Sequence, residues 1–121
     1  MTWFPDELLA RHAREAGGEI ALLAGGLVLT WAELDAWASA VAASLAGAGI
    51  SAGDRVALVG PTDTAGIAGL IGILRAGAVA APVPEGLTSR EVALALEVLA
   101  PSLVLRVAET IATGEPFPAP D

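Results

Sequence analysis

Large apolar residues recur at helical spacing in the segment that follows Thr30. The members of this stripe lie three or four positions apart: Leu34, Trp37, Val41 and Leu45. This spacing is typical of an amphipathic helix that buries one side. Small residues lie beside the stripe and predict that a second element approaches closely: Ala38, Ala42 and Ala46.

Two capping boxes mark where helices begin. Thr30 precedes Glu33 and Thr88 precedes Glu91 by three positions, so each threonine hydroxyl can accept from the later amide while each carboxylate accepts from the threonine amide. The first predicted helix ends at the glycines 47 and 49, and the second runs to Ala100. The second has three apolar residues on one face: Val92, Leu96 and Leu99.

Short apolar runs rich in aliphatic residues predict three core strands, at residues 55–59, 78–83 and 102–107. The first two are joined by a predicted helix at 63–76, whose apolar side is formed by Ile67, Leu70, Ile71 and Leu74. A connection of this length predicts parallel strands joined by a right-handed crossover. This helix carries three glycines that weaken it, and close packing is the expected compensation: Gly66, Gly69 and Gly72.

The N-terminal part predicts a helix from Pro5 to Ala16 and a hairpin with strands at 20–23 and 27–29, joined at Gly25 and Gly26. The predicted fold class is therefore α/β: a three-layer-like fragment with a mainly parallel sheet (βαβαβ) flanked by helices, plus a small N-terminal helix and hairpin. Residues 1–107 form the predicted folded unit. Residues 108–121, with three prolines, are interpreted as a linker or tail.

Composition narrows the classes of partner. The 121 residues carry a formal charge of −8, with six scattered arginines and no lysine, which argues against nucleic acid and anionic membrane surfaces. The absence of cysteine excludes disulfides and thiol chemistry and favours a cytoplasmic location. The most apolar run, residues 65–84, holds Arg75 near its middle, which argues against a membrane span.

Isolated polar residues give no catalytic constellation. His12 has neither a second histidine nor a nucleophile nearby, so a surface histidine is expected. Glu33 is assigned to its cap, with Asp35 beside it, instead of to acid–base chemistry. Asp54 and Arg55 predict a turn and a surface ion pair. We therefore assign no catalytic, cofactor-binding or metal-binding residue.

Two weaker candidates concern glycines and tryptophans. The turn after Val59 follows a strand and precedes a helix, where anions can bind, but it holds Gly60 alone. The glycines 47, 49 and 53 precede a strand, which is the wrong context for a dinucleotide loop. Trp31 and Trp37 are interpreted as core residues, and Trp3 as an N-terminal anchor.

Four motifs carry a resemblance to a known family: LTWAELD (29–35), AGISAGDRVALVGP (48–61), IGILRAGAVAAPV (71–83) and LTSREVALALEVLAPSLVL (87–105). In this order and spacing, the chain resembles the N-terminal subdomain of adenylate-forming (AMP-binding) enzymes from about Pro5 to Arg106. The segment EGLTSREV is more similar to the acyl- or aryl-CoA ligase branch than to peptide-synthetase adenylation domains. Family members often have asparagine near the position of Thr62, which is a departure here.

The resemblance implies an ATP-dependent carboxylic acid ligase that forms an acyl adenylate and then a thioester with CoA. It implies ATP, Mg and CoA as cofactors of the complete enzyme, and none for this chain alone. The family's phosphate loop ending in Pro-Lys-Gly and its catalytic lysine have no counterpart in this sequence. We therefore expect an inactive isolated chain.

The expected partner is the remainder of the ligase, in cis or in trans, and exposed apolar surface could also support self-association. One alternative is a separate non-catalytic subunit or interaction module that pairs with a catalytic polypeptide. Another is an unrelated small nucleotide-binding α/β protein, which titration with ATP and CoA would reveal.

Overall fold

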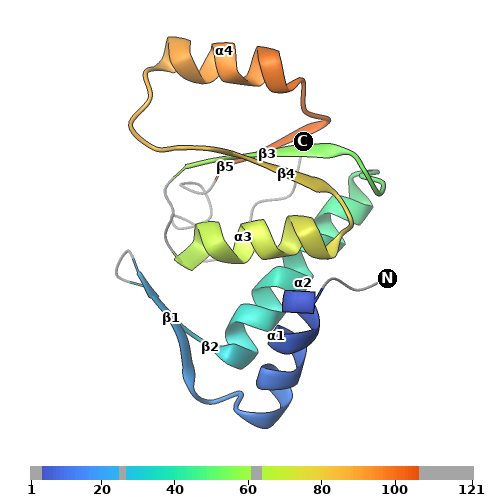
Figure 1. Cartoon of the computed structure of the whole chain (residues 1–121), viewed down its shortest axis with the longest axis vertical. Helices are drawn as coiled ribbons and strands as arrows, with labels where there is room; N and C mark the ends of the chain where they lie inside the picture. The colour runs from blue at the N-terminus through green and yellow to red at the C-terminus, as the bar shows by residue number, and fades with distance from the viewer. Residues whose placement is uncertain (1–3, 25–26, 61–63, 107–121) are drawn as a thin grey trace.

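The structure is a computed structural model that describes residues 4–24, 27–60 and 64–106. The elements in chain order are α1 (Phe4–Glu15), β1 (Ile20–Ala24), β2 (Leu27–Thr30), α2 (Trp31–Gly47), β3 (Arg55–Val59), α3 (Thr64–Arg75), β4 (Val79–Val83), α4 (Ser89–Leu99) and β5 (Leu103–Arg106). Every predicted helix and strand is present, with ends that differ by one or two residues (Figure 1).

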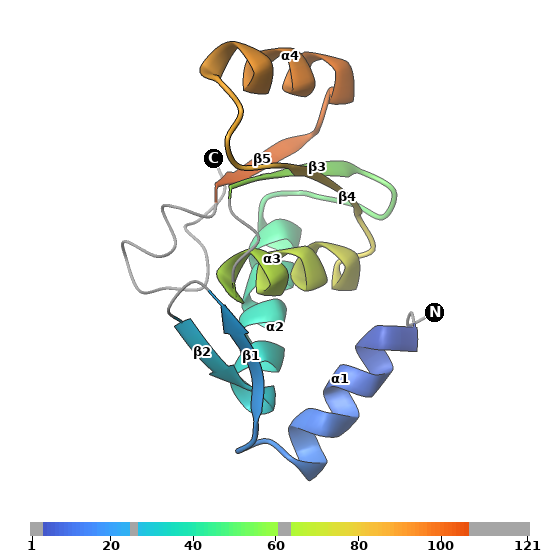
Figure 2. The ribbon, with the colours of Figure 1, turned by 60° about the vertical axis from the view of Figure 1, so that its left-hand side comes forward.

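The three C-terminal strands form one parallel sheet with β3 in the middle, in the order β4-β3-β5. Helices α2 and α3 cover one face of this sheet, and α4 lies on the other face (Figures 1 and 2). The predicted α/β class with a parallel sheet between helices is therefore confirmed.

The N-terminal part forms a separate layer below α3. Strands β1 and β2 pair antiparallel as predicted, with Leu23 opposite Val28. The hairpin and α1 both pack against α2, and Figure 2 shows them on opposite sides of it. The predicted glycine turn at Gly25 and Gly26 lies outside the described residues, as do Trp3 and the predicted linker 108–121.

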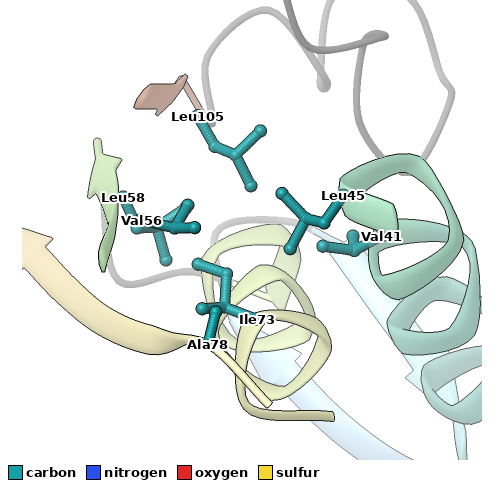
Figure 3. Close-up of a cluster of buried hydrophobic side chains, with 7 residues drawn as sticks. All are labelled: Val41, Leu45, Val56, Leu58, Ile73, Ala78 and Leu105. Carbon is teal, nitrogen blue, oxygen red and sulfur yellow. The ribbon is translucent and has the colours of Figure 1, made fainter. Parts of the chain in front are cut away.

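Two clusters of buried side chains hold the layers together. The first joins α2, α3 and the sheet and consists of Val41, Leu45, Val56, Leu58, Ile73, Ala78 and Leu105 (Figure 3). The second joins α1, the hairpin, α2 and α3 and consists of Leu9, Leu29, Leu34 and Ala68. The predicted stripe of α2 is thus buried at three of its four positions. Trp37 is half-buried between the clusters, and Ala38 takes the fully buried place beside it.

Helices α2 and α3 meet at Gly72. A Cβ atom built on Gly72 would lie 2.5 Å from Cβ of Val41 and 2.9 Å from the carbonyl oxygen of Ala38. Only a glycine allows this approach, because real Cβ atoms do not come so close to other heavy atoms. The close packing predicted for the glycines of this helix is therefore confirmed at Gly72. Of the small residues of α2 that were predicted to allow a close approach, Ala38 lies at this contact and Ala46 is exposed.

The apolar side of α3 differs from the prediction. The residues predicted to face the core, Ile67, Leu70, Ile71 and Leu74, are all half-buried, whereas Ala68 and Ile73 are fully buried. Helix α3 lies between the sheet on one side and α2 with the hairpin on the other, so it is apolar almost all round. A helix of that kind has no single apolar stripe from which its orientation can be deduced.

Helix α4 is held more loosely. Its predicted inner residues Val92, Leu96 and Leu99 are half-buried, and no residue of α4 is fully buried. On its outer side Leu94 is 50% exposed and Val98 is 83% exposed. The parallel sheet is consequently well covered on one face and thinly covered on the other.

The apolar run at residues 65–84 divides into α3 and β4, as its pattern predicts. Arg75, which argued against a membrane span, ends α3 and turns into the protein interior. Among the helices of residues 4–24, 27–60 and 64–106, none has the length and hydropathy that crossing a bilayer requires.

Candidate functional site

The carboxyl edge of the parallel sheet is the first place to search for a site. Strands β3, β4 and β5 all end there, and helices α3 and α4 begin there. The chain places β4 on one side of β3 and then β5 on the other, so the strand order reverses between β3 and β5. Open parallel sheets bind ligands at such a reversal.

An apolar cleft of about 240 Å³ lies at this edge, between the end of β4 and the start of α3. Its lining comes from β3, β4, the residues that directly follow them, and α3: Leu58, Gly60, Gly66, Ile67, Leu70, Pro82, Val83 and Pro84. None of these side chains can donate or accept a proton. The described lining can therefore hold an apolar group, and its own side chains supply no acid–base or nucleophilic group.

A second cleft of about 350 Å³ lies beneath α4 at the carboxyl ends of β3 and β5. Arg106 gives it a cation and Ser89 a hydroxyl, next to apolar residues of α4. The N-terminus of α4 is nonetheless occupied by its own cap: Glu91 Oε1 accepts from the amide of Thr88 at 3.1 Å. A carboxylate in this position opposes the binding of phosphate to the helix end.

Both predicted capping boxes are confirmed. Thr30 Oγ1 accepts from the amide of Glu33 at 3.2 Å, and Thr88 Oγ1 accepts from that of Glu91 at 3.1 Å. The hydrogen bonds from the backbone and hydroxyl of Thr88 lower the pKa of Glu91 below its ordinary value. Glu33 is therefore part of a cap, as predicted.

Both ion pairs found among the described residues involve Arg75. Its Nε donates to Asp6 Oδ1 at 2.6 Å, and its Nη2 lies 2.5 Å from the same oxygen and 2.9 Å from Asp35 Oδ1. Its Nη1 donates to the carbonyl oxygen of Asp35 and to Ser39 Oγ. Burial by itself would lower the pKa of Arg75, but the bonds and charges of Asp6 and Asp35 outweigh it and raise that pKa.

This cluster joins α1, α2 and α3 and was missed from the sequence. The Nε, Nη1 and Nη2 atoms of the guanidinium all contact acceptors on α1 or α2, so Arg75 has no free group for a ligand. We call Arg75 with Asp6 and Asp35 the arginine clamp. An arginine in the middle of an apolar run was the available signal, because a buried arginine requires a carboxylate partner. Sequence alone did not identify which carboxylate.

The remaining polar candidates are separate from one another. His12 is exposed, its Nδ1 lies 2.9 Å from the carbonyl oxygen of Leu8, and its ring lies 4.8 Å from that of Trp31. Asp54 forms the predicted turn by accepting from the amide of Ser51 at 2.8 Å. The predicted ion pair of Asp54 with Arg55 is wrong: the ion pairs of the described residues all involve Arg75.

In the described part of the chain, no group of three or more histidine and acidic side chains is placed to hold a metal ion. Trp31 and Trp37 pack against the buried clusters, as predicted, and form no stacking array. The two glycines of the α2–β3 connection, Gly49 and Gly53, have φ angles of 86° and 87° and serve its turns.

Comparison with known proteins agrees with this architecture. Residues 9–118 match the family of AMP-binding enzymes. Naringenin synthase of Pestalotiopsis fici is 36% identical over 91 residues, which are 75% of this chain and 3% of that protein. The 4-hydroxyphenylalkanoate adenylyltransferase of Mycobacterium marinum is 36% identical over 86 residues, which are 69% of this chain and 14% of that enzyme. Phenyloxazoline synthase MbtB of Mycobacterium tuberculosis is 41% identical over 73 residues, 60% of this chain and 5% of that protein.

Solved structures show the same fold. The fatty acid AMP ligase of Legionella pneumophila matches 89% of this chain and 20% of its own, with a TM-score of 0.75 and 26% identity. A long-chain-fatty-acid CoA ligase from Rhodopseudomonas palustris matches 97% of this chain and 31% of its own, with a TM-score of 0.76 and 24% identity. The chain thus spans a third or less of each of these proteins. It belongs to the AMP-binding enzyme family, and its fold is that of the N-terminal subdomain of adenylate-forming ligases.

Proposed function

We propose that this chain is the N-terminal structural portion of an ATP-dependent carboxylic acid ligase, which forms an acyl adenylate and then a thioester with CoA. The match of residues 9–118 to the AMP-binding family is the observation that carries the proposal. The segment EGLTSREV, with its capping box at Thr88, supports the CoA-ligase branch by its resemblance. ATP, Mg and CoA are cofactors of the complete enzyme in this proposal.

The chain's own role is architectural. Adenylation requires donors around the phosphates and a cation that offsets charge in the transition state. The sequence contains no lysine, and Arg75 is committed to Asp6 and Asp35. Arg106 is exposed and lies near the N-terminus of α4, where Glu91 already accepts from the amide of Thr88. The isolated chain therefore lacks the groups for the reaction, and the catalytic residues belong to other polypeptide.

The remainder of the ligase is the proposed partner, in cis or in trans. Large apolar side chains of the described residues are exposed on four elements (β1, β2, β4 and α4), which supports a further covering layer: Ile20, Leu23, Val28, Val79, Leu94 and Val98. The same surface supports the alternative of a separate non-catalytic subunit that pairs with a catalytic polypeptide, and it could also drive self-association. The proposal places the protein in the cytoplasm, with no role for nucleic acid or membrane, in keeping with the charge of −8 and the lack of cysteine.

An ATP–pyrophosphate exchange assay tests the proposal. The purified chain, given ATP, Mg and a panel of carboxylic acids, should show no exchange above the rate without protein. Exchange by the purified chain alone would overturn the architectural role. The reading frame after the codon for Asp121 distinguishes the two arrangements: a glycine-rich loop ending in Lys-Gly supports a partner in cis, and a stop codon supports one in trans.

A further inference from the structure

The outer side of α4 faces away from the parallel sheet (Figure 1). Helical spacing places Arg90, Leu94 and Glu97 in one row on this side, with Val98 beside it. All four side chains are exposed. Within residues 4–24, 27–60 and 64–106, neither Arg90 nor Glu97 forms an ion pair. We call Arg90, Leu94 and Glu97 the outer row of α4, which thus has an apolar residue between two opposite charges that form no ion pair.

The order of these two charges is unfavourable for an isolated helix. Arg90 lies in the first turn of α4, at the positive end of the helix dipole, and Glu97 lies in the last turn, at the negative end. Seven positions separate them, which is about 10 Å along the helix axis and too far for an ion pair within α4. Stabilisation of the helix itself therefore accounts for neither charge, whereas a partner with the opposite order of charges accounts for both.

A second copy of α4 in the antiparallel direction has that order. A two-fold axis that passes between Ala93 and Leu94 brings Arg90 of each copy to Glu97 of the other, because such an axis makes the two contacts equivalent. Leu94 of each copy then lies over the small side chain of Ala93 in the other. Each charge also moves next to the favourable end of the other helix dipole. A parallel pair would instead place Arg90 beside Arg90.

We propose that the outer row of α4 is the contact surface of a weak homodimer in which two α4 helices pack antiparallel about a two-fold axis. Helix α4 has 11 residues and is therefore about 16 Å long. A contact of this size is smaller than the roughly 1,000 Å² of a stable interface, so we expect a dissociation constant of about 0.1 mM. This inference goes beyond the proposed function and does not rest on it.

Sedimentation equilibrium of the whole 121-residue chain tests the dimer. Between about 0.01 and about 1 mM protein, the average mass should rise from that of the monomer to nearly twice that value, as a dissociation constant of about 0.1 mM requires. A monomer at every concentration would overturn the proposal. Growth beyond the dimer would also overturn it, because an isologous contact is closed.

Variants with exchanged charges test the antiparallel geometry. Arg90→Glu and Glu97→Arg each place like charges opposite one another in a homodimer, so each variant alone should dimerise at least about tenfold more weakly. An equal mixture of the two variants can form both ion pairs again in a heterodimer. The mixture should therefore associate within about threefold of the original chain. A mixture that stays as weakly associated as its components would contradict the proposed pairing.

A matched control separates the specific ion pair from a change of net charge. Arg14→Glu alters the charge by the same amount at an exposed position of α1, so its dimerisation should stay within about twofold of the original. Equal weakening by Arg14→Glu and Arg90→Glu would overturn the proposal. None of these measurements requires ATP or a carboxylic acid, so a failure here is distinguishable from a failure of the ligase assignment.

Discussion

The two faces of the parallel sheet are stabilised to very different degrees. The face covered by α2 and α3 contains the main core, with Leu45, Val56 and Ile73 fully buried. The face covered by α4 has half-buried residues of that helix over a cleft of about 350 Å³, and Val98 of its outer side is 83% exposed. The first face is packed as a protein interior is, whereas the second keeps apolar side chains of its covering helix exposed, as a surface that contacts another layer does.

The largest expected difference between the faces comes from removing one apolar side chain on each. Ile73→Ala creates a cavity in the well-packed face and should lower the free energy of unfolding by about 3–4 kcal/mol, whereas half-buried Leu96 should cost only about 1 kcal/mol when changed to alanine. Urea unfolding followed by circular dichroism measures both. Equal losses would show that α4 is as firmly packed as α3.

Overpacking tests the contact between α2 and α3 next. Gly72→Val places atoms where Val41 and the carbonyl of Ala38 already lie, so we expect a loss of about 3 kcal/mol in the free energy of unfolding. Gly47 is the last residue of α2, and a Cβ atom built on it would meet no packed neighbour within 4 Å. Gly47→Ala is therefore the control, and it should change stability by less than about 1 kcal/mol. A tolerated valine at position 72 would contradict the close approach of these helices.

The arginine clamp joins α1, α2 and α3, and its removal should give the third largest loss of stability. Arg75→Met leaves Asp6 and Asp35 without their partner, and the side chains of Arg75 and Asp6 are 16% and 12% exposed. The pair lies between fully buried and exposed pairs, so we expect a loss of about 2 kcal/mol in unfolding free energy. Arg90 is exposed on α4 and forms no ion pair within the described residues. Arg90→Met should cost less than about 0.5 kcal/mol, and equal costs would disprove the clamp.

The two capping boxes compare a firm helix with a loose one. Thr30→Ala and Thr88→Ala each remove a cap worth about 1 kcal/mol. Because α2 is part of the core, we expect the loss at Thr30 to appear in global unfolding. The loss at Thr88 should appear as faster amide exchange at the start of α4, with little change in the urea midpoint. Identical behaviour of the two variants would mean that α4 unfolds only with the rest of the chain.

Acid should also weaken the cap of α4, because it protonates Glu91, and we expect this to be the smallest of the effects. The folded-state pKa of Glu91 is lowered by its bonds from Thr88, so its stabilisation is present above the ordinary pKa of 4.5 and is lost as pH falls through the lowered value. An NMR titration of the Glu91 side chain should show that lowered pKa. Thr88→Ala keeps the backbone amide, which is the larger cause, and removes the hydroxyl, so the pKa should return only part of the way toward 4.5. An unchanged titration in Thr88→Ala would show that the hydroxyl does not contribute to the shift.

Local signals in the sequence were sufficient to predict most of the fold. The capping boxes, the stripe of α2 and the alternation of helices with aliphatic strands gave the element order and the parallel sheet, because each depends on residues within a few positions of one another. The orientation of α3 could not be predicted, since its apolar residues surround the helix. The clamp of Arg75 was missed because Asp6 lies 69 positions away, and no local pattern specifies such a pair. For the candidate site, the capping role of Glu33 could be predicted from a local motif, whereas the two clefts at the carboxyl edge of the sheet depend on residues of several elements and could not be.

The 69-position separation of Asp6 and Arg75 also has a consequence for synthesis. Helix α1 leaves the ribosome before the other described helices, yet the charge that anchors it is made only at the end of α3. At about 5–20 residues per second, roughly 3–14 s pass between the two. During that interval the ionic part of α1 docking has no partner. Helix α1 is consequently expected to reach its final position only after α3 has been made.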